Sequence, residues 1–84
     1  MNLSYTLRAV ALAQPDAPAI AWSGGAITYG EFETRVAQIA ASLRDRYGLK
    51  PGERVALWLE NGPEFFPVLF GIWRAGLAAV PVNN

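Results

Sequence analysis

The residues best suited to chemistry in this chain are carboxylates and amides near its C-terminal end. Glu60 and Glu64 lie four residues apart, and two neighbouring carboxyl groups can act as general acid and general base, as in glycoside hydrolysis. Asn61 and Asn83 each follow a predicted strand, at the sheet edge where ligands bind in open α/β folds. No pocket signal accompanies the carboxylate pair, and asparagine at such positions is typical of turns and helix caps. We interpret these residues as structural.

The chain lacks the side chains on which enzymes most often depend. It contains no histidine and no cysteine, which excludes the commonest general base, the usual metal ligand and a thiol nucleophile. Ser4, Ser23 and Ser42 therefore have no histidine partner for a hydrolase triad. The only lysine, Lys50, precedes a Pro-Gly turn and is expected in solvent. The eight glycines form neither G-x-G-x-x-G nor a phosphate-binding loop. The sequence assigns no catalytic, cofactor-binding or metal-ligating residue.

Charge and hydropathy exclude several kinds of partner. Seven basic and seven acidic residues are scattered along the chain and give a formal net charge of zero, which argues against the basic patch of a nucleic-acid or membrane-surface protein. Without interleaved basic residues, Trp22, Trp58 and Trp73 are expected in the core rather than as base-stacking platforms. The longest apolar stretch, residues 65–82, is interrupted by Arg74 and is no transmembrane segment. The N-terminus does not read as a signal peptide. We expect a soluble cytoplasmic protein.

A helix and a hairpin are predicted in the first third of the chain. Residues 2–13 are predicted to be helical, and Pro15 ends the helix because proline disfavours helical geometry in the residue before it. Residues 18–22 and 26–28 are short β segments on either side of a glycine-containing turn at residues 23–25, which predicts a hairpin. The residues spaced for one helical face are Leu3, Leu7 and Val10, with Ala11 beside them.

A longer helix is predicted over residues 28–47. Thr28 and Glu31 form a capping-box pattern at its start, and Gly48 is well placed to end it. Glu33 and Asp45 are expected on its solvated side. The residues predicted to share its apolar face are Tyr29, Phe32, Val36, Ile39, Leu43 and Tyr47.

The last third of the chain predicts a strand–helix–strand unit. Residues 54–59 form a near-continuous apolar strand, which is typical of a parallel sheet buried on both faces. A helix should follow from Pro63, a good first helical residue, to about residue 75, where Gly76 caps it. Residues 78–82 form the second strand. The fold class is therefore α/β: helix, β-hairpin, helix, then a β-α-β unit with parallel strands.

The predicted third helix is apolar on nearly every side, which is typical of a buried helix. A chain of 84 residues can cover one side of it, so we expect an apolar patch that needs a partner surface. That partner is the remainder of a longer chain or a second copy, and we expect self-association. One side carries Phe65, Val68, Leu69 and Ile72, and the other carries Phe66, Phe70 and Trp73.

Five stretches in order resemble the N-terminal segment of the adenylate-forming superfamily of AMP-dependent synthetases and ligases, most closely a bacterial acyl-CoA synthetase. The resemblance covers essentially the whole chain. No single stretch is diagnostic, but five in order with the family's spacing make a strong signal. They are QPDAPAI (14–20), AITYGEF (26–32), LKPGERVAL (49–57), ENGPEF (60–65) and RAGLAAVPVN (74–83).

The resemblance implies a parent enzyme that activates a carboxylic acid with ATP and Mg²⁺, forms an acyl-adenylate and transfers the acyl group to coenzyme A. The acid would be a long-chain fatty acid. The family's phosphate loop, adenylate motif, ribose-binding aspartate, hinge and catalytic lysine are not in this chain. We therefore expect residues 1–84 to be the N-terminal subregion of an AMP-binding large domain, without a C-terminal domain and inactive alone.

Two alternatives stay open. Within the superfamily, the second interpretation is the start of a peptide-synthetase adenylation domain, which loads a carrier protein instead of coenzyme A. From a different class, it could be a small self-associating interaction module that uses the surface formed by Phe66, Phe70 and Trp73.

Overall fold

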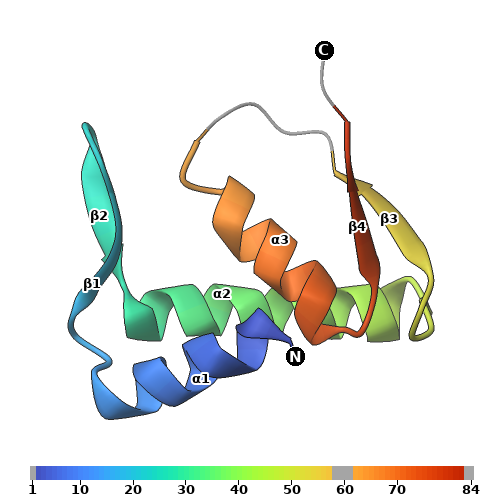
Figure 1. Ribbon diagram of the computed structural model, residues 1–84, viewed down its shortest axis with the longest axis horizontal. Helices are drawn as coiled ribbons and strands as arrows, with labels where there is room; N and C mark the ends of the chain where they lie inside the picture. Colours follow the sequence, from blue (N-terminus) through green and yellow to red (C-terminus); the bar gives the residue numbers. More distant parts are fainter. Residues whose placement is uncertain (1, 58–61, 83–84) are drawn as a thin grey trace.

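The computed structural model describes residues 2–57 and 62–82, which form three α-helices, an antiparallel hairpin and a parallel strand pair (Figure 1). Helices α1 and α2 run along the base in Figure 1, with the hairpin at one end, the parallel strands at the other and α3 between them. The α/β prediction and its element order are confirmed. The elements are α1 (Leu3–Ala13), β1 (Pro18–Trp22), β2 (Gly25–Thr28), α2 (Tyr29–Ala41), a π-helical turn (Ser42–Arg46), β3 (Arg54–Leu57), α3 (Phe65–Arg74) and β4 (Ala78–Pro81).

Helix α1 begins where the sequence predicts, because Asn2 caps it. The Asn2 side chain accepts a hydrogen bond from the Ser4 N–H at 3.0 Å, which satisfies one of the free donors of the first turn. The predicted inward face is only partly correct. Leu3 is 52% exposed, and the buried stripe is Ser4, Leu7 and Ala11. A serine can take a core position here because its polar atoms are bonded, as described below.

The hairpin has the predicted strands with a shorter connection. Strands β1 and β2 pair antiparallel, with Ile20 opposite Ile27 and Trp22 opposite Gly25, so only two residues join them. Ile27 is 4% exposed and fastens the hairpin to the core. A backbone hydrogen bond from Gly30 to the Pro15 carbonyl, at 2.9 Å, ties the start of α2 to the end of α1.

The capping box at the start of α2 is confirmed. The Glu31 N–H donates to the Thr28 hydroxyl at 3.1 Å, and the Thr28 N–H donates to the Glu31 carboxylate at 2.8 Å. At the other end the prediction of one continuous helix is wrong. The helix widens into a π-helical turn that begins at Ser42, which changes the angle between successive side chains. Tyr47 is consequently 64% exposed rather than on the apolar face, although Gly48, with φ of 65°, ends the helix as predicted.

Strands β3 and β4 pair in parallel, with Arg54 opposite Ala78 and Leu57 opposite Pro81, which confirms the β-α-β unit. Burial of β3 on both faces is not found within its described residues. Leu57 is buried and Ala56 is exposed, because helices cover one side of this two-stranded sheet. The rest of the predicted strand, Trp58 and Leu59, lies outside the described residues.

Helix α3 begins two residues later than predicted, at Phe65, and ends at Arg74, two residues before Gly76, whose φ is 79°. Its predicted patch of three exposed aromatic residues is only partly correct. Phe70 packs between Phe32 and Trp73, with ring centroids 5.2 and 5.3 Å away, whereas Phe66 is 46% exposed. Within residues 2–57 and 62–82, no helix is long and apolar enough to cross a membrane.

Helices α2 and α3 pack closely against each other at Gly71. A Cβ atom added at Gly71 would lie 2.5 Å from Cγ2 of Ile39, far inside van der Waals contact. The glycine therefore sets the distance between the two helices that make up most of the core. Close helix packing, rather than a special backbone angle, explains this glycine.

Replacing Gly71 should loosen this helix pair. Gly71→Ala gains about 1 kcal/mol of helix propensity, but overpacking a closed core costs about 1–3 kcal/mol, so we expect a net loss of up to about 2 kcal/mol. Denaturant unfolding of Gly71→Ala, Ile39→Ala and the double variant measures it. The loss of unfolding free energy in the double variant should be smaller than the sum of the two single losses. Additive losses would show that Ile39 does not meet the new methyl group.

The capping box should make stability sensitive to acid. The hydrogen bond from the Thr28 backbone lowers the pKa of Glu31 below its ordinary value of 4.5. A carboxyl group that is more acidic in the folded chain stabilises the fold above the unfolded pKa and loses this effect as pH falls through the folded pKa. As the pH falls below about 4.5, the free energy of unfolding should therefore decrease less for Glu31→Gln than for the parent chain. Asp16→Asn, which alters an exposed turn, is the control and should follow the parent.

Candidate functional site

The polar residues that the sequence singles out do not converge in the described structure. Glu60, Asn61 and Asn83 lie outside the described residues, so the carboxylate pair and the strand-edge amides stay predictions. Glu64 and Lys50 are both exposed, as expected for solvated side chains. The three serines are also separate: Ser23 lies in the hairpin turn, Ser42 in the π-helical turn and Ser4 in α1.

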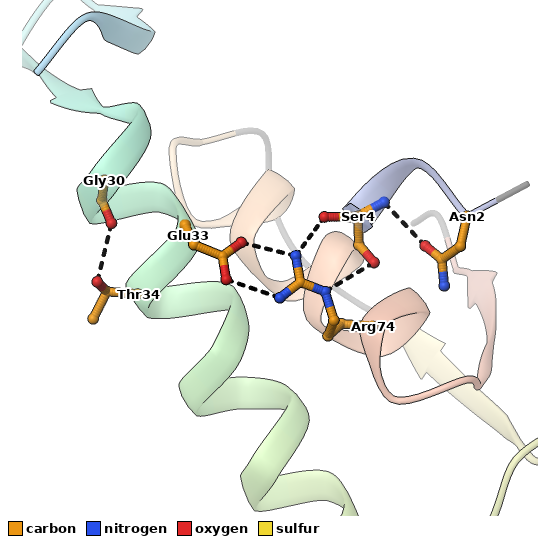
Figure 2. Close-up of polar contacts among 6 residues, drawn as sticks. All are labelled: Asn2, Ser4, Gly30, Glu33, Thr34 and Arg74. Atoms are coloured by element: carbon orange, nitrogen blue, oxygen red, sulfur yellow. Dashed lines mark hydrogen bonds and ion pairs between the residues drawn. The ribbon is translucent and has the colours of Figure 1, made fainter. Parts of the chain in front are cut away.

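The best-organised polar cluster centres instead on Arg74, the last residue of α3 (Figure 2). Its guanidinium group donates to both carboxylate oxygens of Glu33, with Nη1–Oε2 at 2.9 Å and Nη2–Oε1 at 2.8 Å. The side chains are 8% and 22% exposed. The prediction that Glu33 lies on a solvated face is therefore wrong, since α3 covers that part of α2.

The other edge of the Arg74 guanidinium group faces the start of α1. Nε donates to the Ser4 hydroxyl at 3.2 Å, and Nη2 also donates to the Ser4 carbonyl. Asn2 extends the cluster, because its side chain caps Ser4 and donates to the Trp73 carbonyl. The Tyr5 ring lies 4.9 Å from the guanidinium carbon, at the distance of a cation–π contact.

This geometry fixes charges rather than activating them. The hydrogen bond to Glu33 raises the pKa of Arg74, against the opposing effect of burial, so the guanidinium stays protonated. Its four hydrogen bonds use four of the five N–H donors that arginine carries. Glu33 accepts two of them and is neutralised. The cluster of Arg74, Glu33 and Ser4, which we call the arginine clamp, joins three helices and contains no activated nucleophile.

Sequence reasoning missed the arginine clamp because its members are far apart in the chain, but one signal was present. Arg74 is the only charged residue between residues 65 and 82, and a charge in such an apolar segment needs a buried partner. Among residues 2–57 and 62–82, no three histidine, cysteine, aspartate or glutamate side chains gather to hold a metal ion.

Comparison with known proteins identifies the family. A family model described as AMP-binding enzyme matches residues 7–84. The chain belongs to the AMP-binding enzyme family. A long-chain-fatty-acid–CoA ligase of Haemophilus influenzae is 44% identical over 69 residues, which are 82% of this chain and 12% of the ligase. A feruloyl-CoA synthase of an Amycolatopsis species is 42% identical over 69 residues, which are 82% of this chain and 14% of the synthase.

A solved structure of a nonribosomal peptide synthetase contains the same fold. The nonribosomal peptide synthetase FmoA3, in its alpha-methyl-L-serine-AMP bound form, matches with a TM-score of 0.91 and 35% identity over 98% of this chain and 9% of that chain. The chain thus spans a small part of the AMP-binding enzymes that it resembles. The resemblance read from its five stretches is confirmed.

Breaking the arginine clamp should destabilise the fold strongly. Arg74→Met keeps much of the apolar stem but leaves the Glu33 carboxylate partly buried without its partner, and removing one member of a buried pair costs about 3 kcal/mol or more. Denaturant unfolding gives the loss, and Arg46→Met is the control on an exposed arginine. In the double variant Arg74→Met/Glu33→Met, at least half of the loss should return. A loss below about 0.5 kcal/mol, as is usual for surface positions, would contradict the arginine clamp.

Proposed function

We propose that residues 1–84 are the N-terminal subregion of the large domain of an ATP-dependent acyl-CoA synthetase. In the proposed reaction, a carboxylate attacks the α-phosphorus of ATP, forming an acyl-adenylate and releasing pyrophosphate. The thiol of coenzyme A then takes the acyl group and AMP leaves. The match to the AMP-binding enzyme family over residues 7–84 carries this proposal.

In this proposal the chain is a scaffold. Parallel sheets are normally covered on both faces, and the β3–β4 pair is covered by helices on one, so it suits a larger sheet to which further strands and helices add. The arginine clamp holds the end of α3. Strand β4 follows closely, since it begins at Ala78, two residues after Gly76. The described residues supply no activated nucleophile, and the binding of ATP, Mg²⁺ and coenzyme A is assigned to residues outside this chain.

The acid substrate is proposed as a long-chain fatty acid. The name of the Haemophilus influenzae relative supports it, while the feruloyl-CoA synthase supports an aromatic acid for the same type of reaction. A peptide-synthetase adenylation domain is the alternative, because the solved structure described above has the same fold. We also propose a cytoplasmic location for the parent enzyme.

Self-association also remains a proposal. Ala19, Ile20 and Ala21 of β1 face Phe66 and Phe70 across an apolar hollow of about 340 Å³. In a longer parent chain this surface would be available to the remainder of that chain, and in the isolated segment to a second copy.

A segment exchange tests the scaffold role. The matching segment of the Haemophilus influenzae ligase is replaced by this chain, and ATP–pyrophosphate exchange is measured with fatty and aromatic acids. We expect the chimera to keep the activity and acid preference of the ligase, and the 84-residue chain alone to show no exchange. The chimera with Arg74→Met should lose activity together with stability, whereas Arg46→Met should not.

Two results would contradict the proposal. Exchange by the short chain alone would mean that it holds a nucleotide site of its own, and a folded but inactive chimera would mean that it does not fit the scaffold. Light scattering of the short chain over a concentration series tests self-association separately, since a mass that stays monomeric would exclude it.

A further inference from the structure

A polar hollow of about 310 Å³ lies between α1 and α2, beside the arginine clamp. On one side its lining is a stripe made of Glu33, Ala37 and Ala40 from α2 and Arg44 from the π-helical turn that follows, at spacings of four, three and four residues. Tyr5 and Arg8 line it from α1. The small side chains of the two alanines in the middle of the stripe leave room for the hollow, and the longer side chains line its edges.

The charges around this hollow do not cancel. Glu33 is neutralised by both of its hydrogen bonds to Arg74. Arg8 and Arg44 are exposed, and the Arg74–Glu33 pair is the only ion pair within 4 Å among residues 2–57 and 62–82. The hollow therefore carries two positive charges beyond the neutral arginine clamp, on opposite walls.

We propose that this hollow binds a phosphate group in its dianionic form. Two guanidinium groups can each offer paired N–H donors to phosphate oxygens, and their two charges match those of a phosphate monoester near neutral pH. The neutral arginine clamp removes the repulsion that a free Glu33 carboxylate would cause. This site is independent of the proposed ligase reaction, because that reaction is assigned to residues outside this chain.

The phosphate group could belong to a soluble metabolite or to a lipid headgroup, and the test separates the two. Inorganic phosphate is titrated into the isotope-labelled 84-residue chain, and the arginine side-chain N–H signals are followed by NMR. We expect saturable shifts at Arg8 and Arg44, with chloride at equal ionic strength causing none. Arg8→Gln and Arg44→Gln should each weaken binding about tenfold, as expected for the loss of one charge-assisted contact.

Arg46→Gln is the matched control, because it removes the same charge two residues from Arg44 without altering the lining of the hollow. It should bind phosphate as the parent does, and all variants should unfold at the same temperature. Equal weakening by Arg46→Gln, or shifts of the same size with chloride, would mean general charge screening and would overturn the site. The absence of any shift would also overturn it.

Vesicles identify the source of the phosphate. Sedimentation with phosphatidylcholine vesicles that contain phosphatidic acid, against phosphatidylcholine alone, reports headgroup binding. Binding that is lost in the double variant Arg8→Gln/Arg44→Gln but kept in Arg46→Gln would assign a lipid headgroup. Binding of inorganic phosphate without vesicle binding would assign a soluble phosphate monoester. If vesicles bind equally to the double variant, they bind elsewhere and do not support the site.

Discussion

The burial of one guanidinium group constrains much of this structure. Arg74 ends an apolar helix and lies among three helices, where an unpaired charge would be very costly. Its partners must therefore be fixed: Glu33 in α2 faces one edge, and the hydroxyl and carbonyl groups of Ser4 in α1 face the other. The positions of α1 and α2 relative to α3 follow from satisfying these donors. The arrangement also gives a favourable interaction with the dipole of α3, because the Arg74 cation lies at the C-terminal end of that helix.

Helix α2 connects the arginine clamp to the other elements of the segment. It packs on α3 through Gly71 and Ile39, so closely that a single added methyl group would collide. One of its ends joins the hairpin through the Thr28 cap, and the other leads through the π-helical turn toward β3 (Figure 1). The two buried clusters of the core lie along it, one with Phe32 and Val36 and the other with Ala40. The hairpin packs mainly on α2, whereas β4 of the parallel pair packs on α3.

Sequence reasoning succeeded where the cause of a structure lies within a few residues. The capping box at Thr28, the positive φ at Gly48 and Gly76 and the parallel unit around α3 all follow from local patterns. It failed where the cause lies far along the chain. Glu33 looks solvated until Arg74, 41 residues away, is placed against it. The inward turn of Ser4 depends on the same partner. A regular helical period places Tyr47 inward, whereas the π-helical turn before it leaves the ring exposed.

The same contrast explains how a segment with no assigned catalytic residue can identify its family. The stretches that carry the resemblance contain residues with structural tasks in this fold. AITYGEF contains the Thr28 and Glu31 cap, and LKPGERVAL contains Gly52, whose N–H donates to the Gly76 carbonyl at 2.9 Å. RAGLAAVPVN begins with Arg74 and contains Gly76. Such residues hold helices and strands in place and need no part in chemistry. The segment therefore identifies the family through its scaffold rather than through catalytic residues.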